Sequence, residues 1–289
     1  MKPPPFDYRA PCTTQEALDA LAGGGAKVLA GGQSLIPLLN MRLAAPARLV
    51  DINGVAGLDT VEVTGEGVRV GALARHARVE RDERAAAVQP LIGQALRHVA
   101  HPVIRNRGTV VGSLAHADPA AELPAVLAVL GGTVEVASAG GRRAVAAADL
   151  FTGPLESCLD EDELALSAFF PAAPRLTGTA FAETARRHGD YALAGVAAVV
   201  ALDDDLRVTS ARAGYLGVAG VPLVLDLSEP AESAARTGDW SAVAAYARER
   251  LDPDGDIHAG AGYRRHLAGV LTERALRAAA RDAVQREAR

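Results

Sequence analysis

The first 56 residues alternate between helix-like and strand-like spacing of apolar positions. The pattern predicts, in order, a helix, a strand, a helix and a strand, over Thr14–Ala22, Lys27–Ala30, Leu35–Leu43 and Arg48–Ile52. Thr13 or Thr14 can cap the first helix and Ser34 the second, while Gly23–Gly25 ends the first. These elements predict a compact subdomain of alternating helices and strands over residues 1–56.

The pattern of residues 57–175 begins with a hairpin and continues with helices and separate strands. The expected strands and helices are Val61–Val63, Val68–Val70, Gln89–Ala100, Ala120–Leu130, Thr133–Ala137 and Leu164–Phe170. We expect Asp118 to cap the helix that begins at Ala120, with Pro119 in its first turn. The segment His101–His116 has no clear period, so we expect it to be irregular.

The last part of the chain, residues 176–289, has the pattern of a small sheet with helices. Pro171–Pro174 and Gly178 interrupt the preceding pattern and indicate a domain boundary. Ala192–Leu202 and Leu206–Gly217 are predicted strands on either side of a turn of three aspartates. The segment Gly262–Arg289 has helical spacing, so the pattern predicts strands followed by a covering helix.

Composition and charge exclude several classes of protein. The 289 residues are 49% hydrophobic, which is enough to bury the core of two domains. The net charge of −5, with both signs interspersed, argues against binding to nucleic acid. No apolar run has the length of a membrane span and no secretory signal follows Met1, so we expect a cytoplasmic location without integral membrane segments. Cys12 and Cys158 are too few for an iron–sulfur cluster, and no metal site is expected.

The first candidate site is the glycine turn between the strand Lys27–Ala30 and the next helix. Gly31 and Gly32 allow close approach of an anion to the backbone, and the N–H groups at the start of a helix favour a diphosphate. Such turns often serve only to reverse the chain, and this one has neither Walker A nor G-x-G-x-x-G spacing. Both interpretations remain open on these residues alone.

The second candidate site is the segment Ile104–Pro124. A long segment between two helices, if exposed, is often functional. Its hydroxyl and carboxyl side chains suit a ribose, a ribityl chain or an adenine edge, and they belong to Thr109, Ser113, Asp118 and Glu122. The alternative is a purely structural role, in which Asp118 only caps a helix.

Three strings in order resemble the FAD-binding medium subunit of molybdenum hydroxylases of the xanthine dehydrogenase and aerobic carbon monoxide dehydrogenase type. They are AGGQSLIPLLNMRL (Ala30–Leu43), IRNRGTVVGSLAHADPAAELP (Ile104–Pro124) and RRHGDYALAGVAA (Arg186–Ala198). The resemblance implies an α+β fold with two FAD-binding subdomains of the vanillyl-alcohol oxidase type, here residues 1–56 and 57–175. A C-terminal domain of a small sheet with helices would follow at residues 176–289.

The resemblance also implies which residues hold the FAD. Contacts are expected from Lys27, Val28, Leu29, Ala30, Gly31, Gly32, Gln33 and Ser34 at the diphosphate, and from Thr109, Val110, Val111, Gly112, Ser113, Ala117, Asp118, Glu122, Ala165 and Tyr191 elsewhere. Tyr191 is similar to an aromatic residue that the family places against the flavin ring. Val111 stands where the family has glycine, and Gln33 where histidine is commoner. No residue is expected to act as a catalytic acid or base, because the flavin supplies the chemistry.

The implied function is electron transfer within a larger complex. The FAD would take electrons from two [2Fe-2S] clusters of a small partner subunit and pass them to NAD, a quinone or oxygen. A large partner subunit would hold the molybdenum cofactor, in a dimer of heterotrimers. The alternatives are an assembly module of the same complex without FAD, and a free-standing FAD oxidase.

Overall fold

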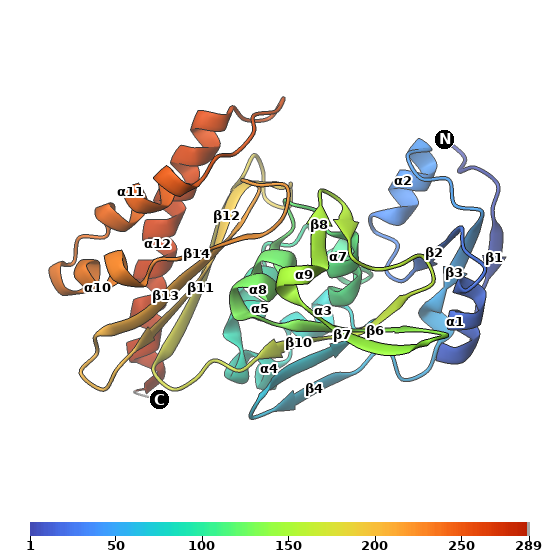
Figure 1. Cartoon of the computed structure of the whole chain (residues 1–289), viewed down its shortest axis with the longest axis horizontal. Coiled ribbons are helices and arrows are strands. Elements are labelled where there is room, and N and C mark those ends of the chain that lie inside the picture. The colour runs from blue at the N-terminus through green and yellow to red at the C-terminus, as the bar shows by residue number, and fades with distance from the viewer. Residues whose placement is uncertain (288–289) are drawn as a thin grey trace.

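Short parallel strands form the first sheet of the computed structural model, which describes residues 1–287 (Figure 1). Strands β1 (Asp7–Arg9) and β2 (Ala26–Leu29) lie parallel to β3 (Arg48–Asp51), on either side of it. Helix α1 (Thr14–Leu21) begins at a capping box, in which the Thr13 hydroxyl accepts from the Glu16 N–H and the Glu16 carboxylate accepts from the Thr13 N–H.

Helix α2 (Leu35–Met41) follows the glycine turn, and the 3₁₀ turn η1 (Ile52–Gly54) follows β3. Ser34 occupies the N-cap position of α2, as expected, but its side chain forms no capping hydrogen bond. Ser34 itself has nearly helical backbone angles (φ −100°, ψ −46°), whereas a capping residue has an extended backbone.

An antiparallel sheet of five strands forms the middle of the molecule. Its order is β4 (Val61–Thr64), β5 (Gly67–Gly71), β10 (Leu164–Pro171), β6 (Thr133–Ser138) and β7 (Gly141–Ala146). The predicted β4–β5 hairpin is confirmed. The sequence did not predict β7 or the elements after it, which are α9 (Ala147–Leu150), β8 (Phe151–Gly153) and β9 (Glu156–Ser157). Most of β7 is exposed, so its apolar alternation is weak.

Short helices pack around this sheet. They are α3 (His76–Glu80), α4 (Glu83–Val88), α5 (Pro90–Leu96), α6 (Pro102–Arg105), α7 (Val110–His116) and α8 (Glu122–Leu130). The expected irregular segment at residues 101–116 is wrong, because it forms α6 and α7. Pro102 occupies the first turn of α6, and the Thr109 hydroxyl caps α7 by accepting from the Gly112 N–H at 3.1 Å. The predicted helix at Gln89–Ala100 ends earlier, at Leu96.

The start of α8 also differs from the prediction. The helix begins at Glu122 rather than Ala120, and the residue before it, Ala121, makes no side-chain cap. Asp118 instead accepts the Ala120 N–H at 2.9 Å, which forms a separate turn ahead of the helix. Asp118 therefore shapes the approach to α8 and does not cap it.

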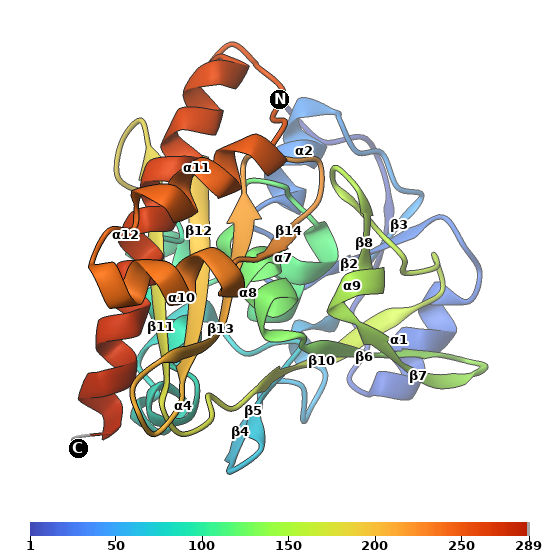
Figure 2. The same ribbon diagram turned by 60° about the vertical axis from the view of Figure 1, so that its left-hand side comes forward.

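The C-terminal part is an antiparallel sheet of four strands with helices on both faces (Figures 1 and 2). The strands in order are β11 (Thr177–Ala185), β12 (Ala192–Leu202), β13 (Val208–Leu216) and β14 (Leu223–Asp226). One face is covered by α10 (Ser228–Thr237), α11 (Ser241–Arg250) and α12 (Ala261–Glu287). The other face packs against α5 and α8. The predicted last helix is α12 as far as Glu287, and residues 288–289 lie outside the described part.

Alternate residues of β12 belong to different cores. Val196, Ala198 and Val200 pack with the C-terminal helices, whereas Ala197 and Val199 pack with the core of the five-stranded sheet. This follows from the two-residue period of a strand with both faces covered.

Gly178, expected at a break between domains, lies inside β11. A Cβ atom there would collide with the backbone of α12 at Ala279 and Ala283. The glycine thus permits close packing of a helix on a strand. None of the helices within residues 1–287 combines the length and the apolar character needed to cross a membrane.

Candidate functional site

The turn between β2 and α2 presents unpaired backbone N–H groups. Within residues 1–287, the N–H groups of Gly31, Gly32, Gln33 and Ser34 donate no hydrogen bond to the protein. Gly32 has φ +72°, a conformation that glycine adopts without strain. The Gln33 side-chain amide donates to the Gly31 carbonyl oxygen at 3.0 Å, which braces the turn. A row of free N–H groups in a loop suits an anion such as a diphosphate.

This turn lies directly against the start of the second predicted site. A Cβ atom on Gly31 would lie 2.5 Å from the carbonyl oxygen of Arg107 and 2.8 Å from Cα of Gly108. A Cβ atom on Gly108 would in turn lie 2.9 Å from Nδ1 of the buried His76 ring. The structure therefore brings the first two sequence motifs into backbone contact, and glycine is required at both positions.

Two residues that the sequence analysis missed connect the turns. The Arg75 guanidinium donates to the Arg107 carbonyl oxygen at 2.5 Å and to Oδ1 of Asn53 at 2.6 Å. The Asn53 amide donates to the Ala30 carbonyl oxygen at 2.8 Å. Asn53 follows β3 at the edge where β2 also ends. Polar residues after neighbouring parallel strands are a signal that the sequence contained.

Arg75→Met is expected to lower the free energy of unfolding by about 2 kcal/mol, because two hydrogen bonds from a charged group are lost. Urea unfolding of the chain measures this change. Arg81→Met is the control, since Arg81 is exposed and its replacement should change stability by less than about 0.5 kcal/mol. Equal urea midpoints for both variants would show that the hydrogen bonds of Arg75 contribute nothing to the free energy of unfolding.

Most backbone N–H groups of the second motif are already used. Those of Gly112 and Ser113 donate to the side chain and carbonyl of Thr109, and that of Val110 donates to the Ala74 carbonyl. Within residues 1–287, Val111 is left with an N–H group that donates to no protein atom. The Thr109 N–H likewise donates to no protein atom among these residues, so Thr109–Ser113 offers two free N–H groups, together with the polar side chains of the segment.

A group of acidic residues lies where α8 begins. Glu122 is only 9% exposed, and burial, followed by the nearby Glu183 carboxyl and Asp118, raises its pKa to about 8. Partial burial and the carboxyls of Asp118 and Glu122 also raise the pKa of Tyr191. Glu183 lies 3.4 Å from Nδ1 of His98 through one oxygen, and its other oxygen is buried and lacks a hydrogen-bond partner among residues 1–287. Residues of the second and third motifs thus meet beside the Glu122 carboxyl, whose raised pKa favours the protonated form at neutral pH.

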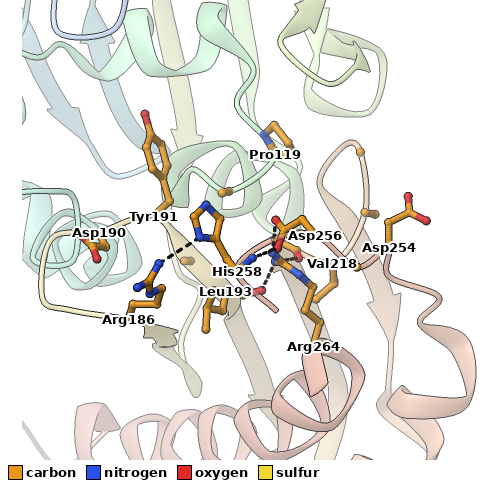
Figure 3. Close-up of a pocket in the computed structure, with 16 residues that line it drawn as sticks. Pro119, Arg186, Asp190, Tyr191, Leu193, Val218, Asp254, Asp256, His258 and Arg264 are labelled. Carbon is orange, nitrogen blue, oxygen red and sulfur yellow. Dashed lines mark hydrogen bonds and ion pairs between the residues drawn. The ribbon is translucent and has the colours of Figure 1, made fainter. Parts of the chain in front are cut away.

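A pocket of about 500 Å³ opens between these motifs (Figure 3). Its walls include Pro119, Tyr191, Leu193, His258 and Arg264. Tyr191 lies at the rim, and the residue is 72% exposed. The seven-residue helix α7, about 10 Å long, separates this end of the second motif from the end that touches Gly31.

The remaining residues expected to contact FAD lie near the first turn and near α7. Val28, Leu29 and Ala30 are half-buried and lead into the first turn, and Lys27 is exposed. Ala117 ends α7 in a left-handed conformation with φ 54°, and Ala165 is buried in β10, against which α7 packs. No group of three or more potential metal-ligating side chains occurs among the described residues.

The sequence matches two family profiles that together span most of the chain. Residues 4–173 match the "FAD binding domain in molybdopterin dehydrogenase", and residues 179–279 match the "CO dehydrogenase flavoprotein C-terminal domain". The chain belongs to the FAD-binding family of molybdopterin dehydrogenases. FAD is the cofactor of this family, in agreement with the expectation from the three motifs.

Close relatives cover almost the whole chain. The 6-hydroxypseudooxynicotine dehydrogenase complex subunit alpha of Paenarthrobacter nicotinovorans is 40% identical, over 96% of this chain and 95% of that protein. The crystal structure of quinoline 2-oxidoreductase from Pseudomonas putida 86 matches with a TM-score of 0.90 and 37% identity, covering 98% of this chain and 99% of that one. Carbon monoxide dehydrogenase from Hydrogenophaga pseudoflava matches with a TM-score of 0.89 and 34% identity, covering 96% and 98%.

This member of the molybdopterin dehydrogenase FAD-binding family is an oxidoreductase subunit of the molybdenum hydroxylase type. The predicted α+β fold, with an FAD-binding part followed by a C-terminal domain of the CO dehydrogenase flavoprotein type, is confirmed.

Proposed function

We propose that the turn at Ala30–Ser34 binds the diphosphate of FAD and that the flavin ring lies toward Tyr191. The observation that carries this proposal is the row of four unpaired N–H groups at Gly31, which has no room for a side chain, and Gly32, which has a positive φ. Thr109–Ser113 then face the middle of the cofactor, and Ala117, Asp118, Glu122 and Ala165 lie toward the ring. Lys27–Leu29 support the turn from β2.

Bound FAD supplies the exchange between one-electron and two-electron transfer. The residues of this chain bind and orient the cofactor, and the Tyr191 side chain limits access of water to one face of the ring. We assign no acid–base step to any residue. The protein therefore acts through placement of the cofactor between its electron donor and acceptor.

The proposal extends to the complex in which the chain works. A small subunit with two [2Fe-2S] clusters would deliver electrons, and a large subunit with the molybdenum cofactor would oxidise the substrate. The acceptor would be NAD, a quinone or oxygen. We further propose a dimer of heterotrimers in the cytoplasm, with the chain divided into residues 1–56, 57–175 and 176–289.

The sequence identities with the relatives favour one class of substrate for that complex. Relatives named for 6-hydroxypseudooxynicotine and quinoline are 40% and 37% identical, whereas the carbon monoxide dehydrogenase is 34% identical. We propose that the assembled complex oxidises a nitrogen-containing aromatic compound. Substrate choice belongs to the large subunit, so assays of the purified complex with quinoline, an aldehyde and carbon monoxide decide between the classes.

Reconstitution of the chain with FAD tests the central proposal. We expect a flavin absorption spectrum, about one FAD per chain and a thermal midpoint that rises with FAD concentration, because the ligand binds the folded state. Affinity purification of the tagged chain from its host should also recover an iron–sulfur protein and a molybdenum protein. A chain that forms the complex yet never binds FAD would support the assembly-module alternative, and turnover without partners would support a free-standing oxidase.

A further inference from the structure

A buried arginine of α12 reaches across to the strands that adjoin the third motif. Arg264 is 7% exposed, and its Nη1 donates to the carbonyl oxygens of Leu193 at 2.6 Å and Gly217 at 2.8 Å. Its Nη2 forms an ion pair of 2.6 Å with Asp256 (Figure 3). A guanidinium suits this task because it donates several hydrogen bonds in a fixed plane.

One of the two carbonyl groups belongs to the third motif, and the other belongs to a residue that is hydrogen-bonded to the second motif. Leu193 is two residues beyond Tyr191 at the start of β12. Gly217, just past β13, donates its own N–H to the Pro119 carbonyl oxygen at 2.8 Å, and Pro119 follows Asp118. Arg264 thereby connects the segment around Tyr191 with the turn that leads to α8.

The other partner of Arg264 forms the outer wall of the pocket. Asp256 accepts from the backbone N–H groups of His258 at 2.8 Å and Ala259 at 2.9 Å. The hydrogen bond from the Ala259 N–H, then those from Arg264 and from the His258 N–H, lower the pKa of Asp256 to about 2, so its carboxyl is ionised at neutral pH. The His258 ring lies 3.3 Å from Nη1 of Arg186, five residues before Tyr191. The wall is thus bonded to the chain both before Tyr191, at Arg186, and after it, at Leu193 through Arg264.

We propose that Arg264 is a positioning residue that fixes Tyr191 relative to Pro119 and thereby sets the surroundings of the flavin ring. The inference rests on the proposed function, since it concerns the same site. A role limited to packing of α12 would predict a loss of stability alone, whereas the positioning role predicts an altered flavin environment and a looser Tyr191 segment.

The neighbouring arginine provides a matched control. Arg265 lies on the same helix but donates to the Leu251 carbonyl and to Asp252, away from both strands. The test compares Arg264→Met, Arg264→Lys and Arg265→Met in the full chain reconstituted with FAD. The measurements are the visible absorption spectrum, the flavin fluorescence, the midpoint potential and the Kd for FAD.

We expect Arg264→Met to shift the spectrum and the potential and to weaken FAD binding about tenfold, as for loss of hydrogen bonds from a charged group. Arg264→Lys should recover part of the change, and Arg265→Met should match the unaltered protein. Wild-type spectrum, potential and Kd in a folded Arg264→Met chain would overturn the inference.

A second measurement needs no cofactor. Trypsin cleavage after Arg186 and Arg187, which are exposed and close to Tyr191, is followed by mass spectrometry in the chain without FAD. Faster cleavage in Arg264→Met and Arg264→Lys than in Arg265→Met would support positioning of this segment, and equal rates would contradict it. If the unaltered chain bound no FAD, the proposed function would fail while this comparison still decided the role of Arg264.

Discussion

Gly31→Ala should weaken FAD binding about 100-fold, because the added Cβ would lie 2.5 Å from the Arg107 carbonyl oxygen and 2.8 Å from Cα of Gly108. Backbone atoms cannot rotate away as a flexible side chain can. The two turns must therefore separate, and the free N–H groups lose their alignment. Titration of the apoprotein with FAD, followed by flavin fluorescence, measures the effect.

Gly93→Ala is the matched control for this substitution. Gly93 lies in α5 and a Cβ atom there would meet no atom within 4 Å. This variant should bind FAD normally and gain about 0.5–1 kcal/mol of stability, since alanine favours a helix. A Gly31→Ala chain that bound FAD as tightly as Gly93→Ala would show that the diphosphate lies elsewhere.

The stability of the apoprotein should fall as the pH rises from about 5 to 8, and Glu122→Gln should abolish much of that fall. Burial and the neighbouring Glu183 raise the pKa of Glu122 from 4.5 to about 8. Between these values the folded chain holds a proton that the unfolded chain has released, so increasing pH favours unfolding. The glutamine variant should be more stable than the unaltered protein at pH 8.5 by an amount on the order of 4 kcal/mol.

Urea unfolding at pH 5, 7 and 8.5 measures this dependence. Glu66→Gln replaces an exposed carboxylate in the β4–β5 turn, and its pH profile should follow that of the unaltered protein. At pH 5 the Glu122→Gln variant should differ little, because the native carboxyl is already neutral. Parallel profiles for all three proteins would mean that Glu122 ionises freely in the folded state.

The sequence predicted elements whose pattern reflects burial along a single segment. The β4–β5 hairpin and β12 have continuous or alternating apolar residues between turn residues, so their positions were correct to within a few residues. Helix α7 escaped prediction because Val110, Val111 and Gly112 have low helix propensity. Its stability comes from Val110 and Leu114, both fully buried against other parts of the chain, and a local pattern cannot show this.

The motifs located the candidate site, but they did not reveal what holds it together. Gly31 and Gly32 stood out because glycine pairs before a helix are a local signal. Asn53, Arg75 and Arg264 donate to backbone carbonyl oxygens of distant segments, and every residue of the chain carries the same carbonyl group. No sequence pattern identifies which carbonyl a given side chain will meet. The free N–H groups likewise became visible only when all hydrogen bonds of the turn were known.

Because both faces of β12 are buried, the FAD-binding part and the C-terminal part of the chain are expected to evolve together. Ala197 and Val199 help to form the core beneath α5 and α8, so the C-terminal part supplies one wall of the cofactor-binding part. Homologous recombination between relatives near residue 175 would place β12 of one relative against α5 and α8 of another. Hybrids of that kind should be rare, and substitutions on α8 and on the facing side of β12 should be inherited together.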